Sequence, residues 1–307
     1  MRLSVIDIGT NTILLLVADI DQSGIISVIH DEQVIARLGK GVDEHRMING
    51  ETFERALKFL QTYRTTSETL HAEKIIAVGT SALRDAANRD EFCSFIQNKT
   101  GIKINILSGD DEAEYTFHGA ISGFRGKSKI FSVLDIGGGS AEIVSGSSSR
   151  LISKASLDIG CVRLTERFLQ TSPPTSLEVA EARSFIQQEL VKVDLSTVQE
   201  SKLVGVAGTA TTLAALHQKL PRYDPQRVEG YLLSYDDIRN IFNQLRIKTL
   251  EEIRTVPQIS PGRADIILAG ILILLEFMEA ADAAQIAVSD KGLRYGIALR
   301  ESKRLKE

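Results

Sequence analysis

The sequence has no tryptophan, three methionines, six prolines and only two cysteines among its 307 residues, and 6% of it is aromatic. The two cysteines, Cys93 and Cys161, form no CxxC pair and are too few for a disulfide framework, which favours a reducing compartment such as the cytoplasm. The low proline content and the lack of biased segments exclude fibrous and low-complexity proteins. The remaining composition, 43% hydrophobic and 25% charged, is ordinary for a globular protein.

The sequence also lacks a long hydrophobic run and an excess of positive charge. Its longest apolar run, 266–275, is about half of a membrane span, and Asp7 interrupts the N-terminus before a signal-peptide core. With 36 Lys and Arg against 40 Asp and Glu, the net charge is −4 and gives no long-range attraction to nucleic acid or to an anionic membrane. We therefore expect a soluble cytoplasmic protein with no nucleic-acid or membrane partner, in which any polyanionic ligand meets a local cluster of Arg and Lys.

The order of predicted elements starts twice. The first series has three strands at 3–7, 13–20 and 25–36, a helix at 51–70, a strand at 74–78, a helix from Asn88 capped by Asn88 and Glu91, a strand at 102–107 and a helix at 108–123. The second series has strands at 130–135, 141–146 and 151–157, helices at 162–169 and 176–193, a strand at 202–206, helices at 209–216 and 263–280, a strand at 286–289 and a helix from 293.

Two similar turns close the first strand of each series. They read Asp7-Ile8-Gly9-Thr10-Asn11-Thr12 and Asp135-Ile136-Gly137-Gly138-Gly139-Ser140. The repetition predicts an α/β fold with an internal duplication and two lobes, residues 1–124 and 125–292, joined by a linker at 124–128. We expect the last helix, about 293–307, to pack back on the first lobe.

Each turn offers glycine backbone and hydroxyl groups that can surround a phosphate group. Asp135, at the end of its strand, and Glu142, on the next strand, can hold a hard cation such as Mg²⁺. The alternative is a pair of tight hairpins whose aspartates bond only the turn backbone. Because two related turns occur and one has three consecutive glycines, the sequence favours phosphate binding.

Three further segments have both a functional and a structural interpretation. The acidic run Ser108–Glu112 either caps a helix or includes a carboxylate that orients water. Arg84 either clamps a phosphate or pairs with Asp85 at the surface, and Gly208 with Thr209 either present N–H groups to an anion or begin a helix. Arg263 either points into a cleft or solvates a helix end.

Together these segments resemble the exopolyphosphatase/guanosine pentaphosphate phosphohydrolase (Ppx/GppA) family. The resemblance is carried by ordered motifs along nearly the whole chain, namely Asp7–Thr12, Gly79–Ala86, Leu107–Ala113, Leu134–Ser140, Gly160–Thr165, Gly208–Leu213 and Arg263–Gly270.

This resemblance implies an actin-like, sugar-kinase and heat-shock-protein type of fold, with two lobes around a cleft. It implies a phosphoric anhydride hydrolase that removes the terminal phosphate of inorganic polyphosphate, of guanosine pentaphosphate (pppGpp) or of both, with a divalent metal, usually Mg²⁺, and it favours a homodimer. By matching motifs, Glu112 corresponds to the proposed catalytic base and Asp135 and Glu142 to the metal or water-positioning carboxylates. The phosphate-binding set is Gly9, Thr10, Asn11, Thr12, Arg84, Gly137, Gly138, Gly139, Ser140, Gly208, Thr209 and Arg263.

The sequence departs from the family pattern at three positions. Thr12 stands where Ser is usual, Asp111 replaces a common Glu beside Glu112, and Tyr295 occupies a position that often holds Glu. From its 307 residues we expect the chain to lack the helical domain that long members add. Two other functions stay open from the sequence: an ATP-using kinase of the same fold, and a sensor that binds polyphosphate or a guanosine alarmone, ppGpp included, without catalysis.

Overall fold

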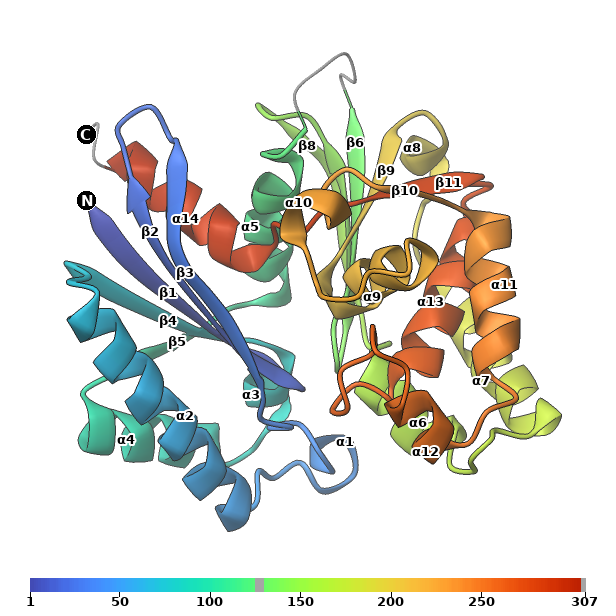
Figure 1. Cartoon of the computed structure of the whole chain (residues 1–307), viewed down its shortest axis with the longest axis horizontal. Helices are drawn as coiled ribbons and strands as arrows, with labels where there is room; N and C mark the ends of the chain where they lie inside the picture. The colour runs from blue at the N-terminus through green and yellow to red at the C-terminus, as the bar shows by residue number, and fades with distance from the viewer. Residues whose placement is uncertain (125–129, 305–307) are drawn as a thin grey trace. The chain divides into compact units, whose positions relative to one another are not determined.

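The structure is a computed structural model and describes residues 1–124 and 130–304. The chain forms two compact units (Figure 1): Met1–Gly119 together with Leu293–Glu307 is unit 1, and Ala120–Gly292 is unit 2. Residues 125–128 of the predicted linker, and residues 305–307 of the predicted last helix, lie outside the described residues. The predicted division after residue 124 therefore stays a prediction.

Unit 1 contains one mixed sheet and the helices that cover it. Its strands are β1 (Arg2–Ile8), β2 (Thr12–Ile20), β3 (Ile26–Ile35), β4 (Lys74–Gly79) and β5 (Ile104–Ile106). Its helices are α1 (Val42–His45), α2 (Gly50–Thr69), α3 (Ser81–Asp85), α4 (Arg89–Thr100), α5 (Gly109–Ile121, whose last residues belong to unit 2) and α14 (Leu293–Arg304).

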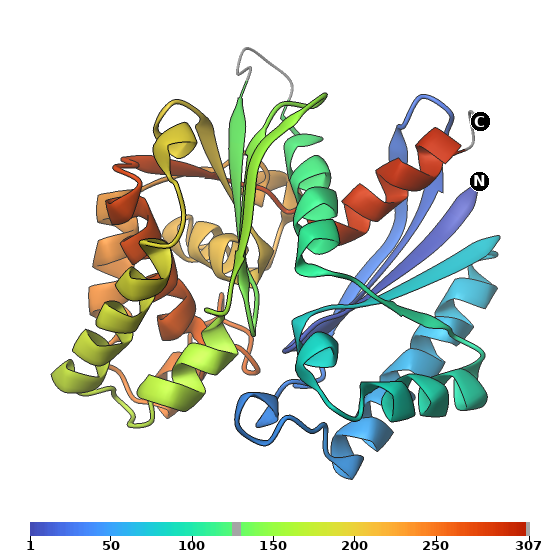
Figure 2. The same ribbon diagram turned by 180° about the vertical axis from the view of Figure 1, so that it is seen from behind.

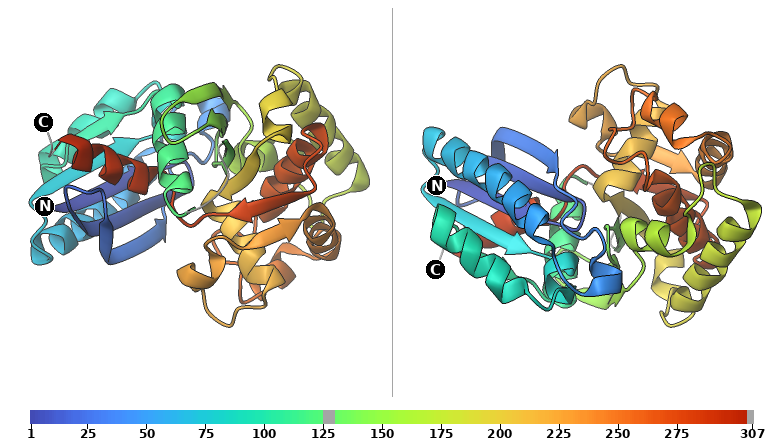
Figure 3. Two further views of the ribbon diagram at one scale, coloured as in Figure 1. Left: turned by 90° about the horizontal axis from the view of Figure 1, so that it is seen from above. Right: turned by 90° about the horizontal axis from the view of Figure 1, so that it is seen from below.

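The two faces of the unit 1 sheet are buried by different helices. On β1, Ile6 and Ile8 belong to a core that includes Leu60 of α2 and Phe92 of α4, and these two helices lie side by side over the sheet (Figure 3). Leu3 and Val5, which point to the other face, pack with residues of α14. The helix at the end of the chain is thus part of the core of unit 1 (Figure 1).

Unit 2 is also built on one mixed sheet. Its strands are β6 (Phe131–Ile136), β7 (Ala141–Gly146), β8 (Leu151–Leu157), β9 (Lys202–Val206), β10 (Leu232–Ser234) and β11 (Gln285–Val288). Its helices are α6 (Cys161–Phe168), α7 (Ser176–Leu190), α8 (Ser196–Gln199), α9 (Ala207–His217), α10 (Pro225–Val228), α11 (Tyr235–Leu245), α12 (Leu250–Arg254) and α13 (Ile267–Ala280).

Helix α13 forms the centre of unit 2. Every residue from Ile267 to Met278 is buried, as expected for a helix that is apolar on all sides. It packs against α6, α7, α9 and α11 and against β6 (Figure 2). Leu134 and Ile136 of β6 contribute to the same core, so α13 fixes the strand that carries Asp135.

The two sheets share one topology, which confirms the predicted internal duplication. Within the described residues the strand order is β3-β2-β1-β4-β5 in unit 1, and β8-β7-β6-β9-β11 in unit 2, where β10 adds one edge strand. In both sheets the first three strands are antiparallel and the last two run parallel to the first. The carboxyl ends of the parallel strands therefore meet at one edge of each sheet, where α/β proteins usually bind ligands.

Two sequence expectations about helix ends are wrong. Asn88 makes no side-chain cap to α4; its amide instead accepts the N–H of Ile48 at 3.0 Å and donates to the Ile48 carbonyl at 2.8 Å. The helix expected from residue 263 begins at Ile267, so Arg263 lies in the preceding turns. For Asn88, the tertiary contact with the backbone of Ile48 takes the place of the predicted helix cap. Of the helices in the described part of the chain, none is long and apolar enough to cross a membrane.

Candidate active site

The two glycine turns have the same backbone closure. The N–H of Gly9 donates to the carbonyl of Thr12 at 3.0 Å, and the N–H of Gly137 donates to the carbonyl of Ser140 at 3.0 Å. A Cβ on either glycine would lie 3.1 Å from that carbonyl oxygen, which is tighter than an ordinary contact. Both turns join antiparallel strands at the same edge of their sheet as the carboxyl ends of the parallel strands, and the tight contact favours glycine at this position in each.

The turn of unit 1 is only slightly accessible. Thr10 is 7% exposed and Asn11 is 8% exposed, and the turn follows Asp7 on β1. Asp7 interacts electrostatically with the buried Arg294 of α14. Arg294 also donates to the carbonyl of Leu15 at 3.0 Å and to the carboxylate of Asp31 at 2.5 Å. The aspartate of the first turn therefore has a cation of its own unit nearby.

Arg84 and Glu112 form an ion pair in unit 1. Arg84, on α3 after β4, donates from Nη1 to the Leu107 carbonyl at 3.2 Å and to Oε2 of Glu112. Glu112 is 8% exposed, and burial raises the pKa of its carboxyl above the ordinary range, while the charge and the hydrogen bond of Arg84 oppose the rise. A buried carboxyl with a raised pKa beside a cation is a suitable group to accept a proton from water.

The neighbouring acidic residues have local partners. Asp111 accepts a hydrogen bond from Ser108 Oγ at 2.7 Å, and its own N–H donates to that hydroxyl at 3.1 Å, so this pair caps α5. Asp85, the surface partner considered for Arg84, lies 3.9 Å from Nη1 of Arg46. The helix-cap interpretation therefore applies to Asp111 and not to the buried Glu112, and Arg84 pairs with Glu112.

Asp135 and Glu142 are direct partners across β6 and β7 in unit 2. Directly opposed residues of an antiparallel pair share one face, with Cβ atoms about 5 Å apart. Glu142 is 2% exposed and accepts a hydrogen bond from Ser156 Oγ at 2.8 Å. In unit 1 the corresponding partner of Asp7 is Leu14. The duplicated turns thus differ: only the second has a pair of carboxylates in this register.

Two adjacent carboxylates fit Mg²⁺, which proteins bind through one or two carboxylates together with water and substrate phosphate oxygens. They do not form a complete protein cage: across residues 1–124 and 130–304, no group of three or more His, Cys, Asp or Glu side chains is placed to hold a metal ion. Asp135 and Glu142 therefore suit a cation that binds together with its phosphate ligand.

The start of α9 lies against Arg263. A Cβ on Gly208 would lie 2.5 Å from Cζ of Arg263, so glycine is required for the guanidinium to pack there, and the preceding Ala207 has a φ of 64°. Thr209 packs its side chain on Gly270 of α13, which leaves its backbone N–H rather than its hydroxyl to meet an anion. Near Arg263, the hydroxyl of Tyr223 donates to the carboxylate of Asp290.

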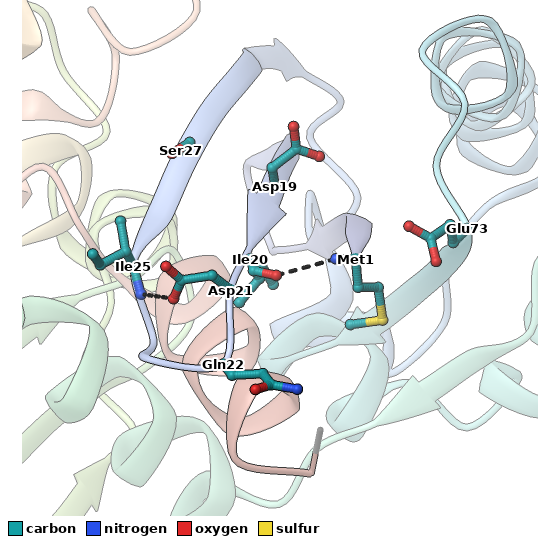
Figure 4. A pocket seen from close by; sticks show the side chains of 8 residues that line it. All are labelled: Met1, Asp19, Ile20, Asp21, Gln22, Ile25, Ser27 and Glu73. Carbon is teal, nitrogen blue, oxygen red and sulfur yellow. Dashed lines mark hydrogen bonds between the residues drawn. The ribbon is translucent and has the colours of Figure 1, made fainter. Parts of the chain in front are cut away.

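A pocket of about 550 Å³ elsewhere in unit 1 contains none of these residues (Figure 4). It lies at the beginning of β1 and the end of β2, and β1 separates it from the Gly9 turn by seven residues, about 23 Å. Its carboxylates have local partners: Asp19 binds Arg2, and Asp21 accepts the N–H of Ile25. Its lining is Met1, Asp19, Ile20, Asp21, Gln22, Ile25, Ser27 and Glu73.

Three residues at the glycine turns have no role predicted from the sequence. Gly39 and Gly160 approach the two turns so closely that a Cβ would meet Thr10 or the backbone of Gly138. Arg163 donates from Nε to the carbonyl of Gly139 at 2.8 Å. Gly160 and Arg163 lie in the Gly160–Thr165 motif, which is the one feature of the sequence that could have pointed to them. Nothing in the spacing of this motif connects it to a turn more than 20 residues away.

The chain is similar along nearly its whole length to one protein family and to solved structures. The sequence model of the Ppx/GppA phosphatase family matches residues 16–305. Exopolyphosphatase 2 of Mycobacterium tuberculosis is 36% identical over 97% of this chain and 98% of its own length. The crystal structure of the Aquifex aeolicus member of the Ppx/GppA family has a TM-score of 0.85 and 33% identity, covering 100% of this chain and 99% of its own. An exopolyphosphatase structure from Cytophaga hutchinsonii has a TM-score of 0.91 and 28% identity, covering 99% and 98%.

Proposed function

Because the chain belongs to the Ppx/GppA phosphatase family, we propose that it is an exopolyphosphatase, which hydrolyses the terminal phosphate of inorganic polyphosphate step by step. The two-unit, duplicated α/β fold is the one expected for this family and agrees with the end-to-end likeness to its solved members. The observation in the structure that carries the proposal is the buried Glu112 carboxylate held against Arg84.

In the proposed reaction Glu112 accepts a proton from water. The water oxygen forms a bond to the terminal phosphorus, the bond from that phosphorus to the bridging oxygen breaks, and the shortened chain leaves with the electron pair. Arg84 keeps Glu112 oriented, opposes the rise in the pKa of its carboxyl and contributes positive charge to the phosphate, which carries spread-out negative charge in such transfers. Catalysis is then mainly positioning and electrostatics.

The glycine turns are proposed to bind phosphate through backbone N–H groups and hydroxyls. In unit 1 this set is Gly9, Thr10, Asn11 and Thr12, and in unit 2 it is Gly137, Gly138, Gly139 and Ser140. Gly208, Thr209 and Arg263 add N–H groups and a guanidinium to the unit 2 set.

We assign Mg²⁺ to Asp135 and Glu142, whose paired carboxylates fit a hard cation. When bound, it would neutralise charge on the phosphate oxygens. The further proposals are that pppGpp is an alternative substrate, that the protein is a homodimer and that it acts in the cytoplasm.

The proposed function is tested by phosphate release from short polyphosphate, long polyphosphate and pppGpp, each with Mg²⁺ and with chelator. Metal-dependent release from polyphosphate supports the proposal and gives the chain-length preference. Release from pppGpp alone would make the protein an alarmone hydrolase. Release from none of them by folded protein contradicts hydrolysis, and ADP formation with ATP and an acceptor would then identify a kinase. Sedimentation of the same sample tests the homodimer.

A further inference from the structure

The carbonyl groups of the second glycine turn are bound by the start of α6. The N–H of Cys161 donates to the carbonyl of Gly137 at 2.9 Å, and those of Val162 and Arg163 donate to Gly138 at 2.8 and 3.1 Å. The Nε of Arg163 donates to Gly139 at 2.8 Å. All three consecutive glycine carbonyls therefore point toward this helix.

This arrangement fixes the direction of the opposite groups in the same peptides. In a trans peptide the N–H points away from the C=O, and within the described residues the cis bond found is Ser172–Pro173. The N–H groups of Gly138, Gly139 and Ser140, which share peptides with the three bound carbonyls, hence point away from α6. Successive N–H groups aimed the same way form an anion-binding concavity.

The first turn is fixed by the same principle without a side chain. The carbonyl of Thr10 accepts the N–H of Gly39 at 2.8 Å, and that of Asn11 accepts the N–H groups of Ala36 and Arg37 at 3.0 and 2.8 Å. The last two peptides of each turn are thus held by their carbonyls, those of Thr10 and Asn11 in the first and those of Gly138 and Gly139 in the second, but the last peptide of the second turn depends on the Arg163 side chain.

Arg163 is unusual for a residue that only holds a loop. Its guanidinium is buried, with the residue 6% exposed, and its Nη2 lies 3.9 Å from the carboxylate of Asp158. Burying a guanidinium is costly, but its charge strengthens the hydrogen bond to the Gly139 carbonyl relative to that of a neutral donor. A cation here adds positive potential beneath the turn, where the three N–H groups already favour an anion.

We propose that Arg163 is a positioning residue for phosphate binding: it fixes the Gly139 peptide with its N–H toward the substrate and strengthens the anion site by its charge. The inference rests on the proposed function for the identity of the substrate, a polyphosphate chain. It goes beyond that function by assigning a role to a residue that reaches the phosphate only through the turn.

The test measures tripolyphosphate binding by calorimetry in the presence of Mg²⁺, in Glu112→Gln protein so that the ligand is not consumed. Arg163→Met and Arg163→Gln remove the charge, and Arg163→Lys retains it. Arg167→Met is the matched control, one turn later on α6, where the guanidinium lies exposed over the Phe185 ring. Thermal unfolding of each variant establishes that it is folded.

We expect the neutral variants to bind tripolyphosphate about 10- to 100-fold more weakly. This is the size of effect expected from losing the charge-assisted hydrogen bond between Arg163 and the Gly139 carbonyl. Arg163→Lys should stay within about threefold of Arg163 and Arg167→Met within about twofold, on the same scale. In protein that keeps Glu112 and is therefore active, the neutral Arg163 variants should raise KM more than they lower kcat. A general loss of stability would not produce this difference.

A folded neutral variant that binds tripolyphosphate as tightly as the parent protein overturns the assignment. Failure of both neutral variants to fold would also overturn it, because Arg163 would then be a structural residue. A parent protein that binds tripolyphosphate but releases no phosphate contradicts the proposed function and leaves the role of Arg163 to be decided by the affinities alone.

Discussion

At the scale of single residues, the proposed chemistry depends on the different surroundings of Glu112 and Asp111. Glu112 is buried against Arg84, whereas Asp111 is exposed and caps its own helix with Ser108. We expect Glu112→Gln to lower kcat about 100-fold or more, the usual contribution of a general base, with tripolyphosphate affinity retained. Asp111→Asn is the control and should leave kcat nearly unchanged. If Asp111→Asn lowers kcat more than Glu112→Gln does, Asp111 is the general base.

The pH dependence follows from the same residue. Burial raises the pKa of Glu112, and a general base is active only when deprotonated, so kcat/KM should fall on the acidic side at a higher pH than for an ordinary glutamate. The charge of Arg84 opposes the rise in the pKa of Glu112. Arg84→Met should therefore move the acidic fall of kcat/KM to still higher pH. The profile of kcat/KM between pH 4 and 8 measures both; an unmoved limb in the variant contradicts the pairing.

The raised pKa of Glu112 has opposite effects on activity and on stability: activity rises with pH, whereas the contribution of this group to stability falls. A carboxyl whose pKa is higher in the folded than in the unfolded protein binds its proton more tightly when folded. Its contribution to the free energy of unfolding is therefore greatest at low pH and is lost as the pH rises through the folded pKa. The stability of Glu112→Gln protein relative to the parent should therefore rise between pH 4 and pH 8, which chemical denaturation at the two pH values measures; a difference that does not change with pH contradicts the raised pKa.

At the scale of elements, each glycine turn depends on a second glycine that approaches it. A Cβ on Gly160 would meet the backbone of Gly138 and Gly139. We expect Gly160→Ala to cost about 1–3 kcal/mol of unfolding free energy and to weaken tripolyphosphate binding, because the turn must move. Gly50→Ala, at the start of α2 with no atom near its Cβ, should be neutral or stabilising by about 0.5 kcal/mol. Chemical denaturation compares the two; equal effects would contradict the close approach.

Helix α14 is the other element with a clear energetic role. Leu293, Ile297 and Ala298 pack with Leu3 and Val5 of β1, and the buried Arg294 binds Asp31. Arg294 is buried but the Asp31 side chain is 32% exposed, so loss of this charged hydrogen bond costs about 1.5–3 kcal/mol, which is still a large share of the stability of a domain. Arg294→Ala should therefore lower the unfolding midpoint of unit 1 markedly, as followed by hydrogen exchange in β1 and β2. Exchange that rises only in unit 2 would contradict the assignment.

At the scale of the whole molecule, a net charge of −4 does not attract a polyanion, so binding must come from local groups and the cation. Tripolyphosphate at about 100 times its Kd should add about 2.7 kcal/mol to the stability of Glu112→Gln protein, roughly 5 °C in the melting temperature. With chelator, or in Asp135→Asn protein, we expect most of this shift to disappear. A full shift without metal would contradict the role of Asp135 and Glu142.

The sequence by itself determined the features that depend on local pattern. Strand periodicity and the repeated Asp-Ile-Gly turns predicted the duplicated α/β fold, because turn chemistry and apolar alternation are properties of neighbouring residues. The ordered motifs indicated the family, which the comparisons then showed. Helix capping, one of the two interpretations left open for Ser108–Glu112, applies to Ser108 and Asp111 because it too depends on neighbouring residues.

Only the tertiary structure decided which of the open interpretations applied where distant segments meet. In the structure Arg84 pairs with Glu112, 28 positions along the chain. Asn88 binds the backbone of Ile48 instead of capping its own helix. The tertiary structure also brings α6 and Arg163 under the second glycine turn. These contacts join segments separated by whole strands and helices, and their partners are set by the order and register of the sheets, which no local pattern specifies.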